Sequence, residues 1–158
     1  MDKVAESDWE VWKTFQIMRR QLDRALEKQL QRDSNISGPD YELLLTLSNA
    51  PDRQLRARDL GELVGWEKSR ISHQVSRMET RGLVERRECG DDARGVWITL
   101  TIEGRRAVVG AMRDHTKAIR EYFFDALTPE QLAVIGAVST NVLEAIDPPA
   151  CSILEETA

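Results

Sequence analysis

The sequence predicts a mainly α-helical protein with a small β-hairpin, built as a winged helix-turn-helix lobe plus a helical dimerisation region. Three observations lead to this class. Apolar residues recur at spacings of three and four over most of the chain. Two short helices, 57–64 and 67–81, flank a glycine-containing turn, which is typical of a helix-turn-helix. The pattern then changes to two strands, 83–88 and 96–101, around a loop with two glycines.

The first helix is expected to begin at Ser7 and to reach about residue 30. Ser7 and Glu10 fit a capping box, in which both side chains bind backbone N–H groups at the helix start. An apolar stripe follows, made of Val11, Phe15, Met18, Leu22, Leu26 and Leu30. A helix of about 25 residues is long for one globular domain, which indicates packing against something extended, such as a second subunit.

The lobe begins with a helix capped by Ser37, with Pro39 in its first turn, that ends at Ala50-Pro51. An extended piece at 54–56 leads into helix 57–64, which Gly65 stops, and helix 67–81, which Gly82 stops. The strands enclose the loop 89–95, the predicted wing.

Two helices complete the chain. Thr101 caps the fifth, whose apolar stripe comprises Val108, Ala111, Met112, His115, Ile119, Tyr122 and Phe123. Thr128, Pro129 and Gln131 start a sixth helix that runs to Ile146. We therefore expect three segments: an N-terminal helix in 1–36, a winged helix-turn-helix lobe in 37–101, and C-terminal helices with a tail in 102–158.

Composition argues against several classes of protein. No apolar run approaches the roughly 18 residues that span a bilayer, and the N-terminus has no signal-peptide core, so we expect no membrane partner and a cytoplasmic location. Cys89 and Cys151 are too few for a disulfide scaffold and are not spaced as a zinc pair, so no metal or cofactor is expected. An enzyme has little support, because there is no phosphate-binding glycine loop, nucleophile elbow or credible Ser/His/Asp set.

A net charge of −5 is unfavourable for binding nucleic acid, but the charge is unevenly distributed. Residues 53–94 carry ten Arg and Lys against eight Asp and Glu, which is +2, so the rest of the chain carries −7. Because phosphate attraction acts over about 8–10 Å, the face on which those arginines lie matters more than the total.

Helix 67–81 has two contrasting faces at 100° per residue. Ile71, Val75 and Met78 form the core face. The opposite face, which has no acidic residue between 69 and 77, holds Ser69, Arg70, His73, Ser76 and Arg77, with Gln74 at its border. Arg can pair with guanine, Gln with adenine, and Ser or His with bases or phosphates, so these six residues are the predicted major-groove set. The competing interpretation is an ordinary solvated face.

In the wing, Arg94 lies between small residues, where its guanidinium can reach a narrow minor groove. Asp92 would orient Arg94 through a charge-assisted hydrogen bond. The alternative is a surface ion pair of almost no energetic value.

These segments resemble the MarR family of bacterial regulators. The resemblance rests on residues 69–84, which end in Met78-Glu79-Thr80-Arg81-Gly82-Leu83-Val84, on Asp92-Ala93-Arg94 in the wing, and on Leu100-Thr101 followed by Gly104. The family pattern is Leu-Glu-x-x-Gly-Leu-Val, Asp-x-Arg and Leu-Thr-x-x-Gly. Met78 replaces the usual Leu, and Ala93 the frequent Arg or Pro. Residues 65–70 and 124–131 resemble members common in actinomycetes.

The resemblance implies a homodimer built from the first, fifth and sixth helices, with double-stranded DNA as partner. Two winged lobes would bind a pseudo-palindromic operator, with recognition helices about one turn of DNA apart. The implied regulation is repression relieved by a small, often anionic or phenolic effector between the dimerisation helices and the lobes.

Three further interpretations stay open. The effector cleft could be lined by Trp9, Trp12, Phe15, Tyr41 and His115. A Trp pair at helical spacing is, however, also typical of packing between subunits. His115 lies on an apolar stripe, which is also typical of a core histidine whose hydrogen bonds are satisfied. Arg86 and Arg87 could lower the pKa of the Cys89 thiol for redox sensing, although Glu88, Asp91 and Asp92 oppose this and the peroxide-sensing relatives carry their cysteine in the first helix. The third interpretation replaces DNA binding with protein binding: the chain would be a winged-helix module whose acidic surface contacts a basic protein.

Overall fold

The computed structural model describes residues 4–88 and 96–146. Its fold is the predicted one, mainly helical with a small antiparallel sheet. The elements in chain order are α1 (Glu6–Ser34), α2 (Gly38–Asn49), the 3-10 turn η1 (Pro51–Arg53), β1 (Gln54–Arg56), α3 (Ala57–Val64), α4 (Lys68–Thr80), β2 (Val84–Glu88), β3 (Val96–Leu100), α5 (Ile102–Tyr122), η2 (Phe124–Ala126) and α6 (Pro129–Ile146).

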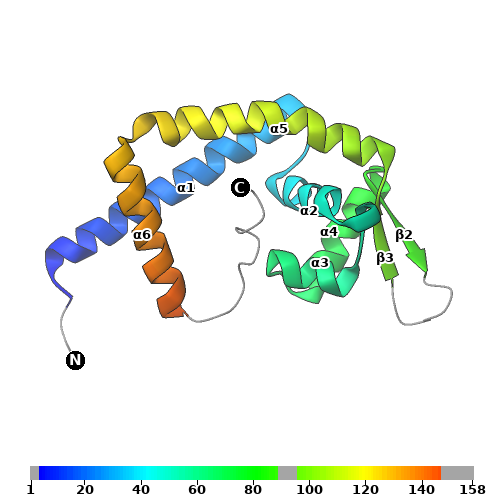
Figure 1. The fold of residues 1–158 in the computed structure, drawn as a ribbon, viewed down its shortest axis with the longest axis horizontal. Coiled ribbons are helices and arrows are strands. Elements are labelled where there is room, and N and C mark those ends of the chain that lie inside the picture. The colour runs from blue at the N-terminus through cyan, green and yellow to red at the C-terminus, as the bar shows by residue number, and fades with distance from the viewer. Residues whose placement is uncertain (1–3, 89–95, 147–158) are drawn as a thin grey trace.

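The molecule has the shape of an arch (Figure 1). The long helices α1 and α5 pack side by side along its top. The lobe formed by α2, α3, α4 and the sheet hangs from one end, and α6 descends from the other (Figure 1). We call α1, α5 and α6 the arms; α1 and α5 also pack against α2 of the lobe.

The sheet has the order β1-β3-β2, with both pairs antiparallel. Ile98 at the centre of β3 faces Leu55 on β1 and Arg86 on β2. The short extended piece expected at 54–56 is thus the third strand, which anchors the hairpin to the helix-turn-helix.

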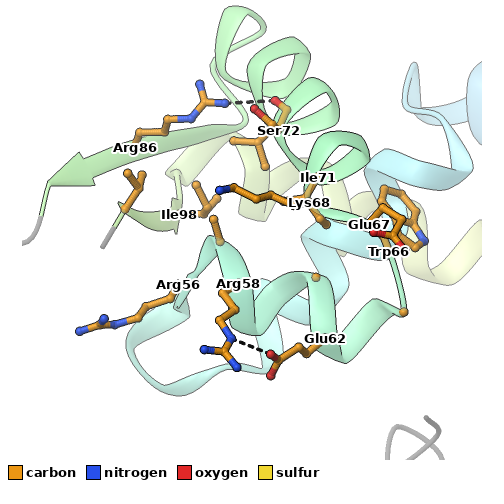
Figure 2. A pocket seen from close by; sticks show the side chains of 15 residues that line it. Arg56, Arg58, Glu62, Trp66, Glu67, Lys68, Ile71, Ser72, Arg86 and Ile98 are labelled. Carbon is orange, nitrogen blue, oxygen red and sulfur yellow. Dashed lines mark hydrogen bonds and ion pairs between the residues drawn. The ribbon is translucent and has the colours of Figure 1, made fainter. Parts of the chain in front are cut away.

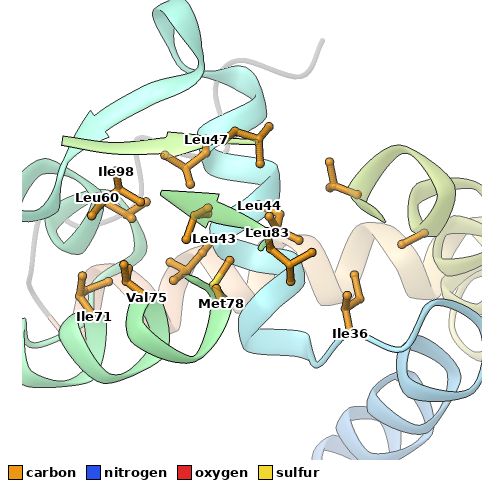
Figure 3. Packing of buried hydrophobic residues seen from close by; sticks show 14 of the residues in the cluster. Ile36, Leu43, Leu44, Leu47, Leu60, Ile71, Val75, Met78, Leu83 and Ile98 are labelled. Atoms are coloured by element: carbon orange, nitrogen blue, oxygen red, sulfur yellow. The ribbon is translucent and has the colours of Figure 1, made fainter. Parts of the chain in front are cut away.

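The core is centred on the lobe (Figure 3) and extends to Leu30 of α1 and to Val108 and Ala111 of α5. Leu43, Leu44 and Leu47 of α2 are fully buried and form its centre. The predicted inner face of α4 packs against them through Ile71, Val75, Met78. Burying an aliphatic side chain of this size contributes about 1.5–3 kcal/mol, so this layer fixes the position of α4.

Three of the four expected helix caps are present. Ser37 and Asp40 form a reciprocal capping box, Thr101 Oγ1 accepts the Gly104 N–H at 2.9 Å, and Thr128 and Gln131 bind each other's backbone N–H. The Ser7 cap was wrong. Helix α1 already begins at Glu6 after Ala5, so Ser7 lies within the first turn and its hydroxyl donates to Asp8 instead.

The arms display apolar side chains to solvent. None of the residues of α6, all of which the structure describes, is buried. A stripe along this helix is about half exposed and consists of Val134, Val138, Val142, Leu143 and Ile146. A similar stripe on the first half of α1 contains Trp9, Trp12, Phe15 and Met18. Exposed apolar surface on this scale marks an interaction site.

Candidate nucleic-acid interface

Helix α4 presents five of the six residues of the predicted set at the surface of the lobe. It begins after Gly65, whose φ of 65° is the left-handed conformation that glycine adopts without strain. Ser69, Arg70, His73, Ser76 and Arg77 are all exposed, opposite the buried face of the helix. The helix therefore offers hydroxyl, imidazole and guanidinium groups on one side.

Gln74 departs from the prediction, because it lies in the interior and not on the border of the outward face. Only 8% of it is exposed, and its Nε2 donates to Asp40 Oδ1 at 2.6 Å. The 100° spacing places Gln74 beside the core residues, and a buried carboxylate on α2 supplies the acceptor that its amide needs there.

Asp40 accepts hydrogen bonds from three sources. Besides Gln74, Arg81 Nη1 donates to Oδ2 at 2.6 Å and the Ser37 N–H donates to Oδ2 at 2.8 Å. A second guanidinium nitrogen of Arg81 donates to the Asn35 carbonyl. Burial acts to raise the pKa of Asp40, but the hydrogen bonds from Ser37 and Arg81 outweigh it, so the pKa lies below its ordinary value and the group is a carboxylate at neutral pH.

Arg70 stacks on an aromatic ring at the start of α4. Its guanidinium carbon lies 3.7 Å from the ring centroid of Trp66, which occupies the turn before the helix. Burial raises the pKa of the Glu42 carboxyl on α2, an effect that the charge of Arg70 opposes. The stack therefore restricts the directions that the exposed Arg70 guanidinium can take.

On its other side, α4 is braced against the hairpin. The Arg86 guanidinium forms an ion pair with Glu79, and the Arg86 backbone N–H donates to the same carboxylate at 3.1 Å. Arg86 Nη2 also donates to Ser76 Oγ at 2.8 Å and to the Ser72 carbonyl at 3.2 Å. The hydroxyl of Ser76, although exposed, is thus engaged with the strand that leads to the wing.

A groove of about 890 Å³ separates α3 and the start of α4 from the sheet. Four cationic side chains line it: Arg56, Arg58, Lys68 and Arg86. Figure 2 shows Arg86 on one side, Arg56 and Arg58 on the other, and Lys68 between them. Glu62 binds Arg58 at 2.8 Å and, with Glu67, is one of the two acidic residues among the lining side chains. Cationic side chains in this position suit the phosphates of a duplex that reaches both α4 and the wing.

The wing prediction falls on residues that the structure leaves out. Asp92, Arg94 and Cys89 all lie in 89–95, outside the described residues. The strands on either side pair along their full length, from Val84 opposite Leu100 to Glu88 opposite Val96. The pairing therefore places Glu88 and Val96, the residues on either side of that segment, directly opposite each other.

Two of the five residues predicted for the effector cleft come together, and three do not. The rings of Tyr41 and His115 lie 4.7 Å apart, and His115 Nδ1 lies 2.8 Å from Gln29 Oε1. Burial lowers the pKa of His115, so the ring is neutral at pH 7. His115 is therefore a part-buried histidine whose Nδ1 has a hydrogen-bond partner in Gln29.

Trp9, Trp12 and Phe15 lie elsewhere, near the start of α1, with about half of each side chain exposed. Trp12 and Gln29 are 17 positions apart on one helix, or roughly 25 Å, so one chain cannot bring this group to His115. In the part of the chain that the structure describes, no group of His, Cys, Asp and Glu could hold a metal ion, and no helix is both long and apolar enough to cross a bilayer.

Three functional supports escaped the sequence reasoning: the buried Asp40, the Trp66 stack and the Arg86 brace. Trp66 and Arg70 stand four positions apart, a spacing at which side chains meet on a helix, so this pair had a visible signal. The tertiary contacts of Asp40 and Arg86 had none, since Gln74 lies 34 positions from Asp40 and Glu79 lies 7 positions from Arg86, each in another element.

The model of the MarR family matches residues 34–95, from the end of α1 through the segment between β2 and β3. No curated protein matches the chain.

Two solved structures from Streptomyces coelicolor are similar over nearly the whole chain. Sco3205, a MarR family transcriptional regulator in complex with DNA, is 34% identical, with 96% of this chain and 95% of that chain covered and a TM-score of 0.87. AbsC, a second MarR family transcriptional regulator, is 32% identical, with coverages of 92% and 98% and a TM-score of 0.84. A mutant MarR from E. coli, complexed with operator DNA, shares the fold at 18% identity, with coverages of 90% and 99% and a TM-score of 0.76.

Proposed function

Since the chain belongs to the MarR family of transcriptional regulators, we propose that it is a homodimeric repressor of a pseudo-palindromic operator, relieved by a small ligand. The observation that carries the proposal is the outward face of α4, where Ser69, His73 and Arg77 are exposed at the surface of the lobe. Because bacterial DNA lies in the cytoplasm, the proposed function implies a cytoplasmic location.

We call α4 with its exposed side chains the reading head. It is held in place before DNA binds. Its buried face packs on α2, and the Arg86 brace fixes it to the hairpin on one side. On the other side, Asp40 and Trp66 hold Gln74 and Arg70. Pre-organised side chains lose little conformational entropy on binding, which favours specific contacts with base edges.

The dimer is supported by the arms. The apolar stripes on α1 and α6 are too large to leave in water, and a second copy offers matching stripes related by two-fold symmetry. Dimerisation would set two copies of α4 on successive turns of the major groove.

Effector binding is supported at the junction of arms and lobe. Tyr41 of α2 and His115 of α5 lie together there, with Gln29 of α1. A small phenolic or anionic molecule at this junction would contact the arms and the lobe at once, and so could change their relative position.

The test is a mobility-shift assay with the DNA upstream of the protein's own gene, at moderate salt. We expect a specific complex with the wild type and a loss of about 1–3 kcal/mol of binding free energy in Arg77→Ala, the cost of losing a specific base contact. Arg113→Ala is the matched control, because Arg113 is an exposed arginine on α5 that binds Asp114.

The absence of a specific shift with the wild type would favour the module that binds a basic protein instead. An equal weakening by both arginine variants would show that Arg77 acts only through net charge. Repression and its relief are then measured with a reporter under the same promoter, with phenolic and anionic compounds added one at a time.

A further inference from the structure

Asp40 of α2 is a buried carboxylate that contacts two points on α4 and is linked through Arg81 to the end of α1. It is 1% exposed, in the first turn of α2. Its oxygens accept from Gln74 and Arg81, and Arg81 also binds the carbonyl of Asn35, the residue that ends α1. We call these four residues the Asp40 cluster.

The two attachment points determine the orientation of α4. Gln74 is in the middle of the helix and Arg81 caps its end, seven positions or about 10 Å along the axis. One contact would fix only a position, whereas two contacts separated along the axis also fix rotation and tilt. The exposed residues His73 and Arg77 are next to or one turn from Gln74, so their direction follows that orientation.

The cluster also joins the head to the arms. Asn35 has a left-handed φ of 53° and ends α1, and Glu27 of α1 accepts the Gly38 N–H at 2.6 Å at the start of α2. The last turns of α1, the first turn of α2 and the second half of α4 therefore form one hydrogen-bonded unit. Helix α1 is an arm of the dimer, so the spacing between the two heads depends on this unit.

We propose that Asp40 is a positioning residue for DNA recognition, which locks the orientation of α4 to the dimer arms and so sets the half-site spacing that the protein accepts. This inference rests on the proposed function. Loosening the cluster should let each head rotate on its own, so that operators with the wrong spacing bind almost as well as the correct one.

The experiment uses the full-length protein and a duplex that the wild type selects from a randomised library. Two further duplexes have one base pair inserted or deleted between the half-sites, which changes the distance and the helical phase of the heads. We expect the ratio of Kd, altered duplex over selected duplex, to be about tenfold or more for the wild type, because the protein or the DNA must deform to fit the altered spacing. Asp40→Asn, which keeps the shape but removes the charge, should reduce that ratio to about threefold or less.

Two further variants keep the test decisive. Arg81→Lys removes the planar fork that bridges Asp40 and Asn35 while leaving the buried carboxylate intact, and it should flatten the spacing preference in the same direction. The exchange Asp40→Asn with Gln74→Glu restores a carboxylate–amide pair with its donors reversed, and should recover the wild-type ratio. Glu103→Gln, an equal change at an exposed site on α5, is the control and should leave the ratio unchanged.

The spacing ratio separates positioning from stability. A variant that is only less stable has fewer active molecules, so its binding to all three duplexes weakens equally and the ratio stays at the wild-type value. That result in Asp40→Asn and Arg81→Lys would overturn the inference and leave the proposed function intact. A wild type that selects no duplex would overturn the proposed function itself, and the inference with it.

Discussion

Gly104 and Gly110 stand on the same helix, α5, in opposite environments, and their replacement by alanine should have opposite effects. A Cβ on Gly104 would overlap the carbonyl oxygen of Leu83 and lie 2.8 Å from Leu100 Cδ1 and 3.0 Å from the Leu83 carbonyl carbon. A Cβ on Gly110 would meet nothing within 4 Å. Gly104 lies at the final glycine of the Leu-Thr-x-x-Gly pattern, which therefore has a steric reason.

The magnitudes follow from these contacts. Carbon and oxygen approach to about 3.3 Å without strain, so Gly104→Ala must move backbone, since Leu83 O cannot rotate away. Overpacking of this kind costs about 1–3 kcal/mol, and a backbone neighbour puts the cost at the upper end. The same oxygen accepts the Thr101 N–H at 3.2 Å, so the start of α5 is disturbed as well. Gly110→Ala has only the gain in helix propensity, about 0.5–1 kcal/mol.

Urea titration and thermal melting followed by circular dichroism measure both variants at one protein concentration. At about 2–4 °C per kcal/mol, Gly104→Ala should melt roughly 5–10 °C below the wild type and Gly110→Ala about 1–4 °C above it. The reasoning is refuted if the two substitutions shift the midpoint in the same direction, because their only difference is the space around the Cβ.

Three other perturbations have defined outcomes. Arg86→Met removes the brace of α4 and should lower the free energy of unfolding by about 1–2 kcal/mol in urea titration, since the ion pair with Glu79 is about one-third exposed. Burial lowers the pKa of His115, so as the pH falls the unfolded chain takes up a proton at this histidine at a higher pH than the folded chain does. The free energy of unfolding should therefore fall as the pH drops below about 6.5. His115→Gln should show a smaller fall between pH 7.5 and 5.5, and an equal fall in both proteins would contradict this. Val138→Asp should convert the proposed dimer to a monomer in light scattering, whereas Thr140→Asp, on the opposite side of α6, should not.

Local patterns carried most of the fold. Helical spacing identified the core face of α4, and the caps at Ser37, Thr101 and Thr128 fixed three helix starts, because each signal lies within a few residues of the feature it predicts. Even β1 was visible as a short extended piece, although its pairing with β3 was not. The family assignment from the residues of α4 and the following strands was confirmed.

The site was only partly predictable, because its supports come from distant parts of the chain. Gln74 stands at the edge of a face, and a helical projection cannot show that a carboxylate 34 positions earlier draws it inward. Trp12 and His115 each lie among apolar residues of their own helix, which suggested one cleft, but most of the length of α1 separates them in space. The outward position of His73 and Arg77, in contrast, follows from the helix period alone. Their contacts with DNA remain predictions.

The bare stripe on α6 ties the lifetime of the chain to its abundance. In the proposed dimer, a helix with no buried residue in its own chain owes its packing to the partner, so dilution removes the support of the whole segment. Stability then rises with protein concentration by mass action. Newly made or surplus single chains would expose an apolar helix that cellular proteases can cut, and paired chains would be spared. The cell could thus keep the level of this regulator low while its paired chains persist longer than its single chains.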